Sequence, residues 1–333
     1  MKSTGMWVAD SQEAYAKAFM EYVNLKKNHL FQVRVCTDEE QLKKILSDEE
    51  IEILLITAEW YETFRELIHQ KSVIILSEGS VSGDIGNCPA VYKYQSVENI
   101  LREVMFYYSE QDSERAYIGV RRDTRVIGVF SPCGGSGKTV FALTLGEILA
   151  EKENQNVLYL NLEECSGIAG YLGGGHWNAS DLIYFLRQNK AQFLYRLNSM
   201  IQKLDRMDYI PPCESYTDFC QITADEWQRL LQLIRTQTHY DSIILDLGNV
   251  MGHEAELLRQ CDGIYVPVRQ DMISRAKVDQ YEMYLQILDG LDILEKMQKL
   301  ELPMCRSTPG STEDLLMLRQ RELGVYIREL LKE

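Results

Sequence analysis

The sequence has few of the features that would place a protein in a membrane, outside the cell or in a metal-binding class. No apolar run approaches the roughly 18 residues that a membrane helix needs, and the opening segment MKSTGMWVAD lacks the long apolar core of a secretory signal. The eight cysteines include no C-x-x-C pair and no Cys/His cluster at zinc spacing. Most of them are expected to be small buried residues in a reducing compartment. These absences predict a cytoplasmic protein that does not insert into the membrane.

Positive charge is also scarce. The 35 basic residues are outnumbered by 50 acidic ones, which gives a formal net charge of −15. Nucleic acid and anionic lipid both attract a positive protein face, so this balance argues against wholesale binding to either. The best local basic candidate, VRRDTR at 120–125, is interpreted as a solvated linker. We therefore expect no nucleic-acid partner and an acidic surface that meets other proteins.

The length of 333 residues suits two domains. In the first part, short apolar runs alternate five times with amphipathic helix patterns. Near-continuous apolar strands separated by helices are typical of a parallel sheet that is covered on both faces. We predict an α/β fold with a five-stranded parallel sheet over residues 1–112, a polar linker over 113–123, and a second, mainly parallel α/β domain over 124–333.

The order and lengths of the predicted elements in residues 1–112 resemble the flavodoxin-like receiver domains of response regulators. Such domains need an acidic pair after the first strand and a phospho-accepting aspartate after the third. Here Asp10 is followed by Ser11, Thr57 stands at the acceptor position, and Lys93 matches the family's lysine. A hydroxyl cannot replace a carboxylate as acyl-phosphate acceptor or magnesium ligand. We interpret this part as a receiver-like docking domain without phosphotransfer; an unrelated small α/β domain is the alternative.

The second domain opens with a strand, RVIGVFS, followed by PCGGSGKT and a helix. This order matches the phosphate-binding loop G-x-x-x-x-G-K-[ST], with Pro132 in place of the first glycine. Glycines let backbone N–H groups turn toward phosphate oxygens, Lys138 would neutralise the β- and γ-phosphates, and the Thr139 hydroxyl would ligate Mg²⁺. A chance glycine-rich turn is the alternative. The candidate nucleotide-binding residues are Gly134, Gly135, Ser136, Gly137, Lys138, Thr139 and Val140.

The double glycine of CGGSGKT resembles the deviant loop KGGxGKT of the MinD/ParA family of positioning ATPases. NVLYLNLEE resembles the family's strand into switch I, and HYDSIILDLGNV resembles its Walker B strand. The resemblance implies ATP and Mg²⁺ as cofactors, with Thr139 and Asp246 at the metal and Lys138, Glu163 and Asp246 as the catalytic set. It also implies a homodimer with the nucleotides between the two subunits.

Three departures from the family pattern fall in the segments that carry its catalysis. Cys133 occupies the place of the signature lysine, and Asn161 and Glu163 replace the D-x-D of switch I. In switch II, Gly248 comes earlier in the sequence than the family's usual glycine, and Gly252 could take the place of that glycine. Positive groups set against a transferring phosphoryl are worth about 10³–10⁵ in rate. We therefore expect Mg-ATP binding with weak or absent hydrolysis. A redox-active thiol at Cys133 is the alternative to a small residue tolerated there.

Several other segments of the second domain each have two possible interpretations. Arg269, Gln270 and the loop around Pro309 occupy positions near the base in the family, but each is equally readable as a strand-end turn or a capped loop. The glycines of 173–175 and Trp177 could form a partner-facing surface or a mobile loop with a core helix. The C-terminal helix carries four basic and five acidic residues, so we expect its apolar side chains to pack onto the sheet rather than to meet lipid.

A receiver-like domain joined to a MinD/ParA-like domain with altered motifs resembles the TadZ/CpaE proteins, which localise assembly of type IVb (Flp/Tad) pili. The resemblance implies a dimeric ATP-binding scaffold that binds pilus-assembly or secretion proteins through its first domain, at the cell pole or the inner face of the membrane. An actively cycling septum- or chromosome-positioning ATPase and a P-loop tyrosine kinase of related fold are the alternatives. The missing lysine argues against the first, and a C-terminal end with one tyrosine, Tyr326, argues against the second.

A redox iron protein of the same superfamily is a further alternative. It would need two bridging cysteines per subunit at defined positions after the switches. We assign no such pair among Cys165, Cys213, Cys220 and Cys261.

Overall fold

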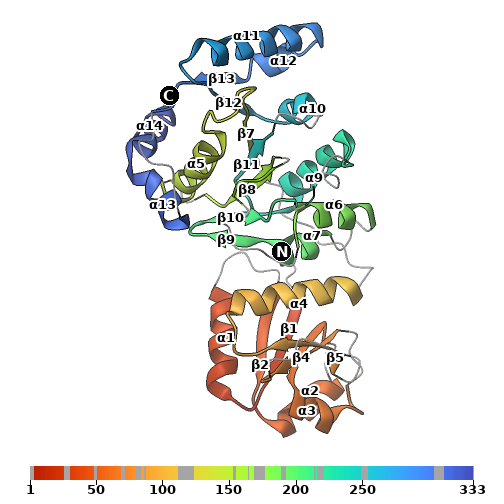
Figure 1. The fold of residues 1–333 in the computed structure, drawn as a ribbon. Coiled ribbons are helices and arrows are strands. Elements are labelled where there is room, and N and C mark those ends of the chain that lie inside the picture. Colours follow the sequence, from red (N-terminus) through yellow and green to blue (C-terminus); the bar gives the residue numbers. More distant parts are fainter. Residues whose placement is uncertain are drawn as a thin grey trace. The chain divides into compact units, whose positions relative to one another are not determined.

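The chain forms two compact units, whose elements are labelled in Figure 1. The computed structural model describes residues 4–25, 31–48, 51–68, 72–79, 84–85, 88–111, 124–152, 155–163, 165–168, 177–188, 193–213, 215, 221–248, 254–303 and 311–332. The first unit comprises Met1–Ile118 with Asn189–Ser199, and the second comprises Gly119–Gln188 with Met200–Glu333. The units differ from the predicted ranges mainly in residues 189–199, which group with the first unit. The predicted linker, 113–123, lies outside the described residues.

The first unit contains one sheet with the strand order β2-β1-β3-β4-β6-β5. Its strands are β1 (Thr4–Ala9), β2 (Phe31–Cys36), β3 (Ile53–Thr57), β4 (Val73–Ser77), β5 (Asp84–Ile85) and β6 (Cys88–Tyr92), and its helices are α1 (Glu13–Leu25), α2 (Glu39–Asp48), α3 (Ala58–Phe64), α4 (Val97–Gln111) and α7 (Phe193–Met200). The first five strands in this order are parallel, which confirms the predicted five-stranded parallel sheet and gives the flavodoxin-like order. The short antiparallel β5 at the edge was not expected.

Both faces of this sheet are buried, as continuous apolar strands require. Because side chains alternate along a strand, Ile53 and Leu55 of β3 join the core formed with α1 and α4. Leu54 and Ile56 join a second core formed with α2 and α3. Every residue of β3 is therefore buried, and neither face of the strand is in contact with solvent.

Helix α7 comes from far along the chain but completes the core on the α1 and α4 side. The ring of Tyr195 lies 5.0 Å from the ring of Tyr108 and 6.3 Å from that of Phe31. The guanidinium of Arg196 lies 4.2 Å from the centre of the Phe106 ring, within cation–π range. These contacts explain why a segment predicted to belong to the second domain groups with the first unit.

The second unit contains a seven-stranded sheet with the order β13-β12-β7-β11-β8-β10-β9. Its strands are β7 (Arg125–Val129), β8 (Val157–Leu162), β9 (Gln202–Leu204), β10 (Met207–Ile210), β11 (Ser242–Leu247), β12 (Gly263–Pro267) and β13 (Met297–Leu300). Its helices are α5 (Lys138–Lys152), α6 (Ala179–Gln188), α9 (Ala224–Gln237), α10 (Glu254–Arg259), α11 (Met272–Ile287), α12 (Leu291–Leu294), α13 (Thr312–Met317), the short 3₁₀ helix η1 (Leu318–Gln320) and α14 (Glu322–Leu330). All pairs are parallel except β9 with β10, which confirms the predicted mainly parallel sheet.

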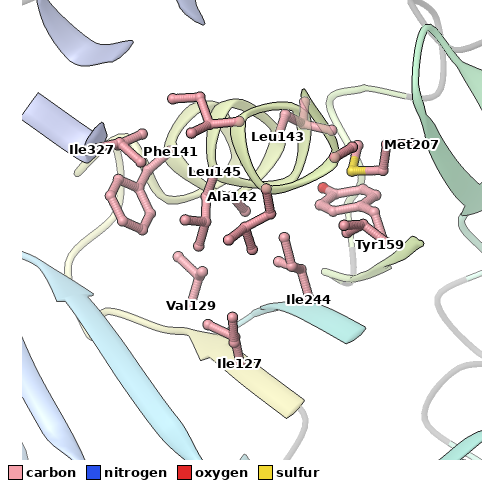
Figure 2. Close-up of a cluster of buried hydrophobic side chains, with 14 of the residues drawn as sticks. Ile127, Val129, Phe141, Ala142, Leu143, Leu145, Tyr159, Met207, Ile244 and Ile327 are labelled. Carbon is pink, nitrogen blue, oxygen red and sulfur yellow. The ribbon is translucent and has the colours of Figure 1, made fainter. Parts of the chain in front are cut away.

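Helix α5 is held by packing on all sides. Residues 141–150 are all buried, as expected of a helix without a polar face. Figure 2 shows Phe141 and Leu145 of α5 packed in the same cluster as Val129 and Ile244 of the sheet, with Ile327 of α14 beside Phe141. Each fully buried side chain of this kind contributes about 1.5–3 kcal/mol. The helix that follows the glycine-rich loop is therefore fixed in position.

The C-terminal segment packs against α5. Leu318, Leu323 and Ile327 are buried in the same cluster, but α14 makes its main contacts with α5 and η1, whereas we had expected it to pack onto the sheet. Val325, which we expected to pack, is instead 51% exposed. Within the described residues, no helix combines the length and the apolar character that crossing a bilayer would require.

Gly146 allows α5 to lie close to the sheet. A Cβ atom there would lie 2.2 Å from Sδ of the buried Met207 and 3.1 Å from Cδ1 of Ile244. We predict that Gly146→Ala lowers the free energy of unfolding by about 1–3 kcal/mol through overpacking, even though alanine favours a helix. Urea unfolding measures this, with Gly167→Ala as the control because its Cβ would meet no atom within 4 Å. Equal stabilities of the two variants would contradict the account.

Glu147 on α5 is 2% exposed and pairs with Arg319 at 3.1 Å. Burial raises the pKa of this carboxyl to about 7, Asp205 raises it further, and Arg319 opposes the change. The folded protein then keeps a proton that the unfolded chain, with a pKa near 4.5, has released. Stability must therefore fall as pH rises from about 4.5 to 7.

We predict that Glu147→Gln removes this loss of stability between pH 4.5 and 7, because glutamine binds no proton in either state. Relative to wild type, its free energy of unfolding should rise by about 2 kcal/mol between pH 5.5 and 8, because each pKa unit is worth about 1.4 kcal/mol. Urea unfolding at both pH values measures the difference. The control is Glu151→Gln, one helical turn further along, where the side chain is 37% exposed and pairs with Arg328. Parallel pH curves for wild type and Glu147→Gln would refute the prediction.

Candidate functional site

The loop between β7 and α5 has the backbone that a phosphate-binding turn needs. Gly135 has a φ of 66° and Gly137 a φ of 86°, a region that side chains rarely allow. Gly134 has no heavy atom within 4 Å of its Cβ position, so this part of the loop is open. Helix α5 begins at Lys138 directly after the loop, and the N-terminus of a helix favours a bound anion.

Lys138, Thr139 and Glu163 meet at the carboxyl end of the sheet. Nζ of Lys138 lies 3.6 Å from Oε1 of Glu163, and the Thr139 hydroxyl donates a hydrogen bond of 3.2 Å to Oε2. The Lys138 side chain is 8% exposed and that of Glu163 is 20% exposed. The carboxylate directly after β8 thus compensates the charge of the loop lysine.

Asp246 completes the cluster from β11 and is fully buried. Its Oδ2 accepts hydrogen bonds from the Tyr159 hydroxyl at 2.8 Å and from Nδ2 of Asn161 at 3.0 Å. Burial raises the pKa of the Asp246 carboxyl to about 7, the charge of Glu163 raises it further, and the nearby Thr139 hydroxyl opposes the change. Its Oδ1 is buried without a hydrogen-bond partner of ordinary geometry among the described residues.

Tyr159 is the functional residue that sequence reasoning missed. It lies two residues before Asn161 on β8, so both side chains point to the same face, and Asp246 is the cross-strand neighbour of Asn161. The sequence pattern indicates Asn161 only as a replacement in the D-x-D of switch I, whereas its amide donates to Asp246. The two-residue alternation from Asn161 was the signal that could have identified Tyr159.

Cys133 is 1% exposed, and its Sγ donates to the backbone oxygen of Ser274 at 3.2 Å. Its backbone N–H donates to Oγ of Ser131 at 3.2 Å. The side chain therefore points into the protein toward the first turn of α11. This burial argues against a redox-active thiol and agrees with the interpretation of a small residue that the site tolerates.

The other candidates give mixed results. Nε2 of Gln270 donates to Glu301 at 3.2 Å, in an exposed pair typical of a strand-end turn. Arg269 lies beside the loop, with Nη1 3.8 Å from the Cβ position of Gly135. The backbone N–H of Gly248 donates to Leu162 at 3.1 Å, which ties the end of β11 to that of β8. The loop around Pro309, the glycines of 173–175 and Gly252 lie outside the described residues.

In the first unit, the carboxyl end of the sheet, which we compared with that of receiver domains, contains a buried ion pair. Nζ of Lys93 lies 2.7 Å from Oδ2 of Asp10, and both side chains are at most 1% exposed. Glu78 lies 3.3 Å from the same nitrogen. Thr57 ends β3 and provides a hydroxyl where an acceptor carboxylate would stand. The lysine's charge is thus balanced by protein carboxylates.

A metal ion at the loop of the second unit would need oxygen atoms from a bound phosphate compound as well as from the protein. Among the described residues, no group of three or more His, Cys, Asp or Glu side chains converges to hold a metal ion. Mg²⁺ commonly binds through one or two protein oxygens together with substrate phosphates. The donors at this site fit that pattern, because Thr139 provides a hydroxyl and Asp246 a carboxylate with one oxygen unused.

The chain matches no protein family and no curated protein, but it is similar to solved structures. A ParA family ATPase from Chlorobium tepidum is 17% identical over 58% of this chain and 81% of its own, with a TM-score of 0.47. A putative plasmid partition protein from Borrelia burgdorferi bound to AMPPNP is 17% identical over 62% and 89%, with a TM-score of 0.45. Cobyrinic acid a,c-diamide synthase from Mycobacterium smegmatis, with an ATP analogue and magnesium, is 17% identical over 62% and 92%, with a TM-score of 0.45.

The hydrogen bond from Asn161 to Asp246 yields a direct test. Asn161→Asp would place two carboxylates about 3 Å apart in a buried site, and like charges at that distance cannot both ionise without cost. We predict a loss of about 2–4 kcal/mol in the free energy of unfolding at neutral pH. The control is Asn156→Asp, since Asn156 donates to Asp241 at the same 3.0 Å but is only half-buried. Losses of equal size would show that burial of the cluster has no special effect.

Proposed function

We propose that the second unit binds ATP together with Mg²⁺ at the loop between β7 and α5. The observation that carries this proposal is the meeting of a buried lysine, a hydroxyl and two carboxylates at one end of a strand–loop–helix unit. Two buried polar atoms there, Oγ of Ser136 and Oδ1 of Asp246, have no hydrogen-bond partner among the described residues. Unsatisfied buried groups of this kind are costly and point to a missing ligand.

Each residue has a role that follows from its position. Lys138 would exchange the carboxylate of Glu163 for phosphate oxygens, and the loop glycines would allow backbone N–H groups to approach them. Thr139 would hold the magnesium ion directly, and Asp246 would hold it through a water molecule. When bound, the ion would neutralise phosphate charge.

We further propose that hydrolysis is slow. The side chain at the position of the signature lysine is a buried thiol, which provides no charge. Glu163, the candidate base, is engaged by Lys138 and Thr139 and must be released before it can orient water. Because that carboxylate does lie beside the loop, an actively cycling positioning ATPase is the second candidate.

The sequence resemblance supplies the wider role. We propose a dimeric scaffold that positions assembly of a type IVb pilus or a similar secretion machine, with nucleotide between the two subunits. The first unit would bind the assembly proteins, because its sheet edge has a buried Asp10–Lys93 pair in place of a phosphotransfer site. The proposed location is the cytoplasm, at the cell pole or the inner face of the membrane through these partners.

The proposal predicts that Lys138→Ala abolishes nucleotide-dependent assembly. Wild type should sediment as a dimer with Mg-ATP and as a monomer without it, and the variant should remain a monomer with ATP affinity reduced by about 10- to 100-fold. Lys43→Ala, which removes an exposed lysine of α2 in the first unit, is the control and should behave like wild type. Sedimentation velocity measures the assembly state. Identical sedimentation of all three proteins with and without nucleotide would contradict an ATP-dependent switch.

A further inference from the structure

We propose that Arg269 contacts the outer phosphates of the nucleotide bound at its own loop and supplies the positive charge that the side chain at Cys133 does not. This inference rests on the proposed function, since it requires that the loop binds a nucleoside triphosphate. The resemblance to positioning ATPases pointed to a contact with the base or to closing of the site, and the geometry points to the phosphate end.

The position of Arg269 follows from the sheet. It lies two residues after β12, which pairs directly with β7, the strand that leads into the glycine-rich loop. Its Nη1 lies 3.8 Å from the Cβ position of Gly135. Gly135 is exposed and belongs to the loop that leads into Lys138, the first residue of α5, which would hold the β- and γ-phosphates. A cation beside Gly135 is therefore close to the same phosphates.

A chain of contacts fixes the arginine there. The Asp271 carboxylate caps α11 by accepting the N–H of Ser274 at 2.9 Å and its hydroxyl at 2.8 Å. The same carboxylate lies 3.2 Å from Nε of Arg269. The backbone oxygen of Ser274 in turn accepts the thiol of Cys133. Cys133 and Arg269 are thus linked through the first turn of α11, and a small side chain at 133 lets that turn lie against the loop.

The guanidinium remains available for a ligand. Arginine offers five N–H donors in a planar fork that suits phosphate oxygens. Asp271 lies at Nε, and the structure gives Nη1 and Nη2 no hydrogen-bond partner within the described part of the chain. The side chain is 58% exposed, so binding an anion requires no rearrangement of the core.

The test compares ATP with ADP. Binding of a fluorescent non-hydrolysable ATP analogue and of fluorescent ADP, both with Mg²⁺, is measured for the full-length wild type, Arg269→Ala, Arg269→Lys and Arg275→Ala. Arg275 is a matched control because it is 59% exposed, lies in the first turn of α11 shortly after Arg269, and pairs with Glu301 at 3.1 Å. We expect Arg269→Ala to lose about tenfold in affinity for the ATP analogue, the effect of one charge-assisted hydrogen bond, and less than about threefold for ADP. Arg269→Lys should recover part of the loss.

Each other outcome overturns the proposal. If Arg269→Ala binds both nucleotides as wild type does, or weakens both equally, Arg269 does not act on the outer phosphates, while the proposed nucleotide site stands. If Arg275→Ala shows the same selective loss, the effect is one of general charge. If wild type binds neither nucleotide, both this inference and the proposed function are wrong.

Discussion

The compensation of buried charge at the carboxyl ends of the two sheets is the constraint on which both candidate sites depend. A charged group taken out of water is costly unless an opposite charge or hydrogen bonds meet it. In the second unit Glu163 meets Lys138, and in the first unit Asp10 meets Lys93. The consequences differ, because Lys138 borders an open glycine loop, whereas Lys93 is fully buried with its partner. In the proposed function the first pair would exchange its carboxylate for a phosphate, whereas the second pair is closed to solvent.

Much of the fold and part of the site could be predicted from the sequence. Continuous apolar runs predicted the sheet of the first unit, and the Gly-Lys-Thr after a strand predicted the loop of the second, because strand, turn and helix patterns are local. The mainly parallel sheet of the second unit was expected from the family resemblance. Glu163 and Asp246 were predicted from the resemblance of their strands to switch I and Walker B. The hydrogen bonds of Tyr159 and Asn161 to Asp246 were not found, because they depend on which strands are neighbours. The grouping of α7 with the first unit, through contacts of Tyr195, is likewise set by packing between distant segments.

The structure also changes how the loss of the signature lysine is understood. Cys133 is part of a packed contact with the first turn of α11, so a lysine there could not occupy the same place without displacing that turn. The resulting geometry sets Arg269 beside the loop. An altered motif and a nearby arginine are then two aspects of one arrangement, which under the proposed function would retain nucleotide binding without a charge that reaches a partner subunit. A scaffold that changes its assembly state with slow turnover is consistent with this arrangement.

The most direct test of this account is a crystal structure of the full chain with Mg²⁺ and a non-hydrolysable ATP analogue. The quantity to measure is the distance from Nζ of Lys138 to Oε1 of Glu163, which is 3.6 Å here. The account predicts that Lys138 leaves Glu163 for a phosphate oxygen, with Mg²⁺ bound to the Thr139 hydroxyl. An intact Lys138–Glu163 pair, with no nucleotide at the loop at saturating concentration, would contradict it.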